Sequence, residues 1–125
     1  MCARDYDRQY LGYFECFNRQ QFFEAHDVLE ALWLPQRQGP NGLFYKGLIQ
    51  LAGAFVHLQK NRLGPARALL ELAQTNLRKY PTTHEGLAVS AVLGIVEAYL
   101  HQLKSAAPAG NPLASAGAPQ LPTPK

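Results

Sequence analysis

Apolar side chains recur along this chain at the spacing of one face of an α-helix, and turn-forming residues interrupt the pattern four times. The pattern predicts five helices, at residues 5–17, 21–34, 42–60, 65–79 and 83–104. Pro35 and Pro81 each end a helix, because proline lacks the N–H that a helix interior requires. Thr82 and Glu85 match the spacing of a capping box, which predicts the start of the fifth helix. The third helix is apolar nearly all the way round, so we expect a compact all-α bundle with this helix at its centre.

Composition supports a single folded domain followed by a different kind of segment. The chain has 125 residues, of which 47% are hydrophobic and 17% charged, so it can build a core and keep apolar surface for a partner. From residue 105 onwards alanine, proline, glycine and serine dominate. A segment of this composition buries too little apolar surface to order itself. We therefore expect a helical domain at residues 1–104 and a flexible tail at residues 105–125.

The fifth predicted helix has apolar or small residues on two of its sides. One side is a wide apolar stripe that we expect to face the core: Val89, Leu93, Val96, Leu100 and Leu103. The other side holds mostly small residues: Leu87, Ala91, Gly94 and Ala98. Because exposed apolar surface marks an interaction site, we expect a homodimer that forms through an apolar helix surface.

Charge and cysteine usage narrow the class of protein. The formal net charge is +3, from 12 basic and 9 acidic residues, which is mild for a nucleic-acid-binding domain. Lys60, Arg62 and Arg67 form a basic patch that no aromatic residue interleaves, so RNA binding through residues 60–67 is only a weaker alternative. Two cysteines without a Cys-x-x-Cys pair, and no leader sequence, predict a cytoplasmic protein with free thiols. The longest apolar run, residues 48–58, is too short to span a membrane.

Most side chains that could carry chemistry lie on the second and third predicted helices. The candidate site comprises Glu24, His26, Asp27, Glu30 and Trp33 on the second helix, and Lys46, Gln50 and His57 on the third. His26 and Glu30 are four residues apart, and Asp27 and Glu30 are three apart, so these side chains can reach one point. The three residues of the third helix lie within about 40° of one another around its axis, with Gly53 beside them.

Three interpretations of this cluster are open. In the first, a buried polar network joins the two helices, and Asp27 or Glu30 pairs with Lys46 while the amide and the histidines satisfy the other groups. In the second, His26 and the carboxylates hold a metal ion with His57 as the one ligand from the third helix, although bundle metal sites usually repeat a Glu-x-x-His pair on two helices. In the third, the same groups perform acid–base catalysis. We favour the first, a structural or interaction module, and assign no metal, cofactor or small-molecule ligand.

Four groups of residues form a longer pattern over about residues 8–80. They are Phe17-Asn18; Phe22-Phe23-Glu24-Ala25-His26-Asp27-Val28-Leu29-Glu30 with Trp33; Gly47-Leu48-Ile49-Gln50-Leu51-Ala52 with His57; and Asn61 with Gly64, Ala66 and Leu69-Leu70. This pattern resembles the domain of unknown function 309 family of small all-helical bacterial and archaeal proteins. The sequence differs from the family pattern at Asp27, where glutamate is usual, and at Pro65. The resemblance implies a compact helical bundle, with the His/acid helix packed on the Gly-Leu-Ile-Gln helix, and it implies no activity.

Overall fold

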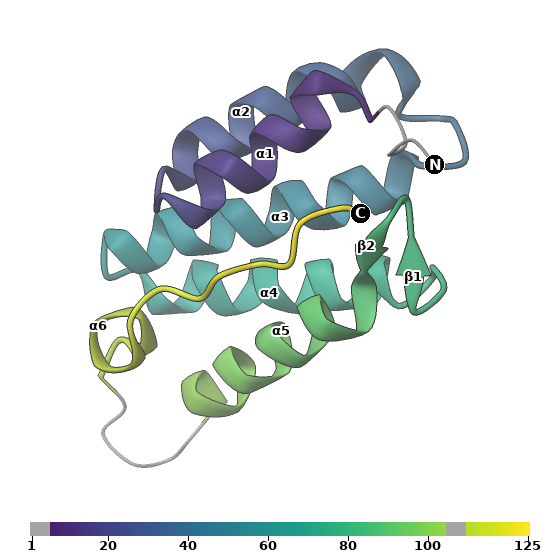
Figure 1. Ribbon diagram of the computed structural model, residues 1–125. Coiled ribbons are helices and arrows are strands. Elements are labelled where there is room, and N and C mark those ends of the chain that lie inside the picture. Colours follow the sequence, from purple (N-terminus) through teal and green to yellow (C-terminus); the bar gives the residue numbers. More distant parts are fainter. Residues whose placement is uncertain (1–5, 105–109) are drawn as a thin grey trace.

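Long helices make up most of the chain in the computed structural model, which describes residues 6–104 and 110–125 (Figure 1). In chain order the elements are α1 (Arg8–Asn18), α2 (Phe22–Trp33), the 3₁₀ turn η1 (Leu34–Gln36), α3 (Gly42–Gln59), α4 (Leu63–Leu77), β1 (Thr83–His84), β2 (Leu87–Ala88), α5 (Val89–Lys104) and α6 (Pro112–Ala116). The predicted all-α fold class is confirmed, with a sixth helix and two short strands added to it. No helix within the described residues is both long and apolar enough to cross a membrane.

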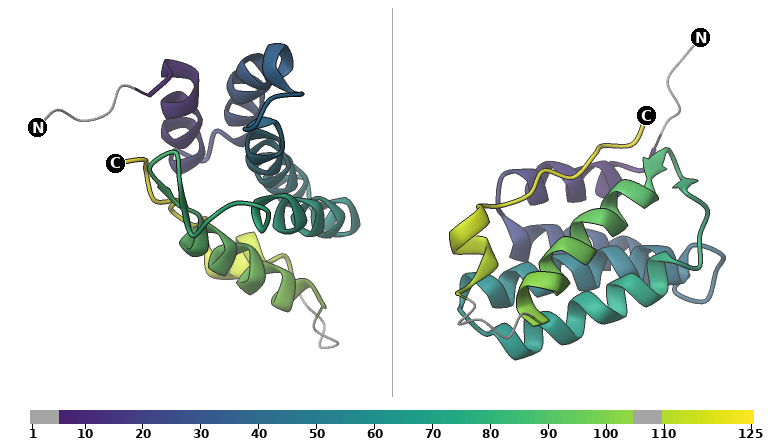
Figure 2. Two further views of the ribbon diagram at one scale, coloured as in Figure 1. Left: turned by 90° about the vertical axis from the view of Figure 1, so that its right-hand side faces the viewer. Right: turned by 90° about the horizontal axis from the view of Figure 1, so that it is seen from below.

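Helix α3 lies at the centre of the bundle, as the sequence predicts. The pair α1–α2 covers one side of α3, α4 packs along another, and α5 lies against α4 (Figure 1, Figure 2). Bulky apolar side chains around α3 are fully buried, among them Phe44, Leu48, Leu51 and Phe55. Gly47 lets α4 approach closely, because a Cβ there would lie only 3.0 Å from the Leu77 side chain. The apolar composition of this segment therefore reflects burial on several sides at once.

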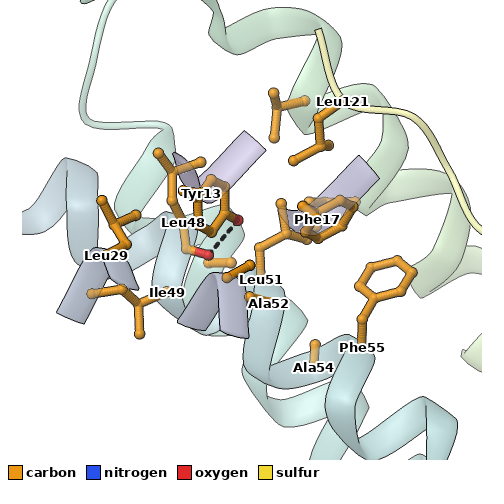
Figure 3. Close-up of a cluster of buried hydrophobic side chains, with 14 of the residues drawn as sticks. Tyr13, Phe17, Leu29, Leu48, Ile49, Leu51, Ala52, Ala54, Phe55 and Leu121 are labelled. Atoms are coloured by element: carbon orange, nitrogen blue, oxygen red, sulfur yellow. Dashed lines mark hydrogen bonds between the residues drawn. The ribbon is translucent and has the colours of Figure 1, made fainter. Parts of the chain in front are cut away.

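The aromatic residues of α1 form its buried inner face. Tyr13 packs edge-on against Phe14, and both rings are sealed from solvent. Figure 3 shows Tyr13 among the buried apolar side chains, where its hydroxyl donates a hydrogen bond to the backbone oxygen of Leu48 at 2.6 Å. Burial, reinforced by the neighbouring Tyr10, raises the pKa of Tyr13 well above its ordinary value. This bond fixes α1 to α3 inside an otherwise apolar core.

The predicted start of the fifth helix is wrong. Thr82 and Glu85 match a capping box in sequence, but residues 83–88 form an antiparallel hairpin of β1 and β2. Its backbone pairs are Thr83 with Ala88 and His84 with Leu87. The turn residues Glu85 and Gly86 have positive φ angles of 48° and 72°, which suit a two-residue hairpin turn and exclude a helical start. Helix α5 therefore begins only at Val89.

Two other helix ends differ from the prediction by a turn or less. Helix α1 begins at Arg8, where the Asp7 side chain accepts a hydrogen bond from the Gln9 N–H at 2.7 Å; the predicted start at residue 5 lies outside the described residues. Helix α4 begins at Leu63, so Pro65 is the third residue of the helix. Proline is tolerated there because the first N–H groups of a helix have no partner within it.

Residues 110–125 lie against the helical body. They include α6, where the Asn111 side chain accepts a hydrogen bond from the Leu113 N–H at 3.0 Å. Beyond α6 the chain runs without regular structure toward the hairpin, and Leu121 is only 3% exposed (Figure 2). The composition of the segment predicts neither feature. The division into a domain at residues 1–104 and a flexible tail at residues 105–125 stays a prediction, and residues 105–109 fall outside the described part.

Candidate functional site

The polar residues of α3 lie where α2 and α4 face each other. This polar strip of α3 consists of Lys46, Gln50 and His57, with Gly53 beside them. Its first side chain contacts Trp33 on α2, and its second contacts Asn76 on α4. The strip thus forms a floor between the two neighbouring helices, and its residues serve different partners along its length.

Lys46 does not make the ion pair that the sequence predicts. Its ammonium lies 4.4 Å from the centre of the Trp33 ring, which is a cation–π distance. Within residues 6–104 and 110–125, no ion pair joins Lys46 to Asp27 or Glu30. Helices α2 and α3 follow each other through a short connection, so the first turns of α3 lie opposite the last turn of α2. That last turn carries Trp33, whereas Asp27 lies nearly two turns further back.

Gln50 pairs with α4 rather than with the acids of α2. The Asn76 side-chain amide donates a hydrogen bond to Gln50 Oε1 at 2.8 Å, and Asn76 is 8% exposed. The sequence analysis did not single out Asn76. A signal was available, because Asn76 follows Ala73 by three residues and so belongs to the apolar face of α4, where a polar group requires a partner. This pair ties α3 to α4.

Three of the predicted side chains come together on α2. His26 Nδ1 lies 3.1 Å from Asp27 Oδ1. One ligand atom from each of His26, Asp27 and Glu30 lies within 4.8 Å of the other two. The His26 side chain is 30% exposed and that of Asp27 is 55% exposed, so the cluster faces solvent. Glu24 is not part of it; burial first, and then carboxylates that include Glu24, raise the pKa of the Cys16 thiol.

A pocket of about 210 Å³ opens beside this cluster. It is lined by Phe23, His26, Gly53, Val56, His57 and Leu69. A Cβ on Gly53 would lie 3.3 Å from Leu69 and 3.8 Å from His26, so the glycine keeps this space free. His57 Nδ1 is buried and has no hydrogen-bond partner among the described residues. A buried polar atom without a partner is costly to the folded chain.

The arrangement differs from a sealed polar network between α2 and α3. A sealed network would bury His26, Asp27 and Glu30 and pair them with α3, but the first two are accessible and hydrogen-bond each other. The contacts of Lys46 and Gln50 remain structural. The cluster is therefore divided into a packed end near Trp33 and an open end at the histidines.

The predicted basic patch is exposed but partly neutralised. Lys60, Arg62 and Arg67 all lie at the surface. The Arg67 guanidinium is 3.7 Å from a Glu71 carboxylate oxygen, and their spacing of four residues on one helix favours this pair. Lys104 lies 3.4 Å from the same carboxylate. Part of the positive charge is thus already paired with an acid of the same chain.

Comparisons with known proteins give a family match over the part of the chain that contains the candidate site. No curated protein and no solved structure was found to match the sequence. The family model described as Domain of unknown function (DUF309) matches residues 10–69, from α1 into α4. The hairpin, α5 and the segment at residues 110–125 lie outside the match. Residues 10–69, which contain all eight predicted site residues, are therefore similar to the DUF309 family.

Proposed function

We propose that this protein binds a divalent metal ion through His26, Asp27 and Glu30, beside a pocket that admits part of a small ligand. The observation that carries the proposal is the convergence of three ligand atoms within 4.8 Å on the exposed side of one helix. The three residues occupy positions i, i+1 and i+4 of α2, so a rigid backbone presents them together. The metal-dependent interpretation is therefore favoured over a sealed structural network.

The donor set suits a first-row divalent ion such as Zn²⁺, Co²⁺ or Mn²⁺. One imidazole and two carboxylates combine ligands that these ions accept. Metal–ligand bonds of about 2.0–2.2 Å place ligand atoms about 3–3.5 Å apart, so the carboxylates of Asp27 and Glu30 must rotate inward when a metal binds. Three protein ligands leave coordination positions for water or a ligand. His57 and the apolar walls of the pocket would then contact whatever occupies those positions.

A titration with Co²⁺ and Zn²⁺ alone tests this proposal. We expect one equivalent to bind, with the visible absorption of Co²⁺ reporting an imidazole-containing site. Glu30→Gln should weaken binding at least tenfold, because it removes an anionic ligand and keeps the shape of the side chain. Glu24→Gln is the matched control, since Glu24 is exposed on the same helix outside the cluster and its loss should leave binding unchanged. Absence of binding at millimolar metal, or equal weakening by both variants, would contradict the proposal.

A second candidate function is an interaction module that self-associates. The observation in its favour is Phe23, which is 60% exposed at the rim of the pocket, together with other exposed large apolar residues: Leu34, Leu43 and Leu72. Of the small face predicted on α5, Ala91, Gly94 and Ala98 are exposed, whereas Leu87 is fully buried and does not belong to it. We propose a homodimer that buries exposed apolar side chains, Phe23 among them. Native mass spectrometry tests it: Phe23→Ser should shift a dimer toward monomer, and a wild-type protein that is monomeric at high concentration would refute it.

Two further proposals come from the sequence analysis. A cytoplasmic location is supported by Cys16, which is a free cysteine, and cell fractionation would test it. RNA binding through the patch at residues 60–67 is the weaker alternative, since Glu71 already neutralises part of its charge. Lack of retention on RNA at low salt would end that alternative.

A further inference from the structure

The chain segment from Gly117 to Lys125 is held on the domain as a bound peptide would be. At the middle of the segment, the Asn18 side chain at the end of α1 hydrogen-bonds both the backbone N–H and the backbone oxygen of Leu121. The Asn18 amide nitrogen donates to the Leu121 oxygen at 3.1 Å, and the Asn18 amide oxygen accepts from the Leu121 N–H at 2.8 Å. The Gln120 side chain adds a bond to the backbone oxygen of Asn18 at 2.9 Å. A side-chain amide thus takes the place of a neighbouring strand.

Both ends of the segment are held through its backbone as well. The hydroxyl of Tyr99 on α5 donates to the backbone oxygen of Gly117 at 2.6 Å. At the other end, the N–H of Lys125 donates to the backbone oxygen of Gly86 in the hairpin at 3.0 Å. Tyr6 donates to the backbone oxygen of Lys125 at 2.8 Å. The contacts therefore come from α1, α5 and the hairpin, which are far apart in sequence and lie along the segment (Figure 1, Figure 2).

One side chain anchors the segment in the core. Leu121 is 3% exposed, and Figure 3 shows it near Phe17 of α1. After Leu121 the half-buried Pro122 and Pro124 alternate with exposed residues. Proline fixes φ and carries no N–H, so such a segment loses little conformational freedom on docking and leaves few donors unpaired. These are the properties of ligands that bind in extended, proline-rich form.

We propose that α1, α5 and the hairpin form a peptide-binding groove for an extended segment in which a leucine anchor is followed by alternating prolines, and that residues 117–125 are its ligand in the same chain. Backbone contacts, the Gln120 side-chain hydrogen bond and one buried side chain, Leu121, hold the segment, so it can leave the groove without dismantling the core around α3. The groove then accepts a second peptide of the same chemistry. The proposal is independent of metal binding on α2.

The test uses the full chain with the ligand segment disabled in place. Leu121→Ser removes the anchor and is expected to empty the groove while circular dichroism shows the helix content unchanged. A fluorescent peptide with the sequence of residues 110–125 should bind this variant at least tenfold more tightly than it binds the wild-type chain, where the tethered segment competes at high effective concentration. Adding Asn18→Ala to the Leu121→Ser chain should weaken peptide binding at least tenfold, because the paired amide is lost.

Hydrogen exchange on the wild-type chain provides the second measurement. The Leu121 and Lys125 amides should exchange at least tenfold faster than amides in the middle of α3, because the segment opens locally. Exchange as slow as that of α3, or global unfolding of the Leu121→Ser chain, would show that the segment is an integral part of the core. Equal binding of the peptide to the wild-type and Leu121→Ser chains, or to neither, would also overturn the proposal.

Discussion

Replacing Tyr13 by phenylalanine removes one hydroxyl from the centre of the bundle and leaves the ring in place. In the structure this hydroxyl is sealed from solvent and donates a bond of 2.6 Å to the backbone oxygen of Leu48. The net value of such a bond is about 1 kcal/mol, and the oxygen that loses it can still serve the helix ladder of α3. At neutral pH we therefore expect Tyr13→Phe to lower the free energy of unfolding by about 1 kcal/mol.

The same substitution should have the opposite effect in alkali. Burial raises the pKa of Tyr13 in the folded chain, whereas in the unfolded chain Tyr13 ionises near its ordinary value of about 10. The wild-type protein therefore loses stability as the pH rises above about 10, by about 1.4 kcal/mol per pH unit from this residue. The Phe variant escapes that loss, so the two stabilities should cross at about pH 11.

Urea unfolding followed by far-UV circular dichroism between pH 7 and pH 11.5 measures this crossing. Tyr45 and Tyr99, whose pKa values burial also raises, are present in both proteins and cancel in the difference. Phe17→Leu is the control, because Phe17 is buried in the same cluster and has no titrating group. Its stability difference from wild type should not vary with pH. A Tyr13→Phe difference that is likewise independent of pH would show that the hydroxyl reaches water in the folded protein.

Two other predictions concern the packing of α3 and the surface of α5. Gly94→Ala should raise the free energy of unfolding by about 1 kcal/mol, because nothing lies within 4 Å of the new methyl group and alanine favours the helix. Gly47→Ala should lower the free energy of unfolding by about 1–2 kcal/mol, because the new methyl group would lie 3.0 Å from the Leu77 side chain. Thermal unfolding of both variants checks this contrast. Lys46→Met should cost about 0.5–1 kcal/mol and change the fluorescence of Trp33, the single tryptophan; an unchanged spectrum and stability would contradict the cation–π contact.

Periodicity predicted the helices well because burial imposes it directly on the chain. The segment at residues 42–60 is apolar on all sides, and it becomes the helix that other helices surround. The hairpin was missed because Thr82 and Glu85 satisfy a local capping pattern. The competing signal was Gly86, and a distant contact also fixes the turn: Tyr10 on α1 donates a hydrogen bond to the backbone oxygen of Glu85 at 3.0 Å. The spacing of residues within a short segment does not predict contacts between residues so far apart in the sequence.

The candidate site shows the same limit. Helical spacing correctly brought His26, Asp27 and Glu30 to one place, because it depends only on the geometry of a single helix. The partner of Lys46 could not be predicted in this way, because it depends on how far α3 is displaced along α2. For residues 110–125, composition reports only whether a segment can bury its own side chains. It says nothing about a groove that Asn18 completes from a hundred residues away.

The meeting of Tyr6 and Lys125 at the hairpin has a practical consequence for engineering. Because residue 6 hydrogen-bonds residue 125, a short linker between them would close the chain into a ring without crossing the bundle. New ends could then be opened in the exposed loop at residues 37–40, where insertions and cuts are best tolerated. Such a circular permutant would begin with α3, so the helix that the others surround would leave the ribosome first.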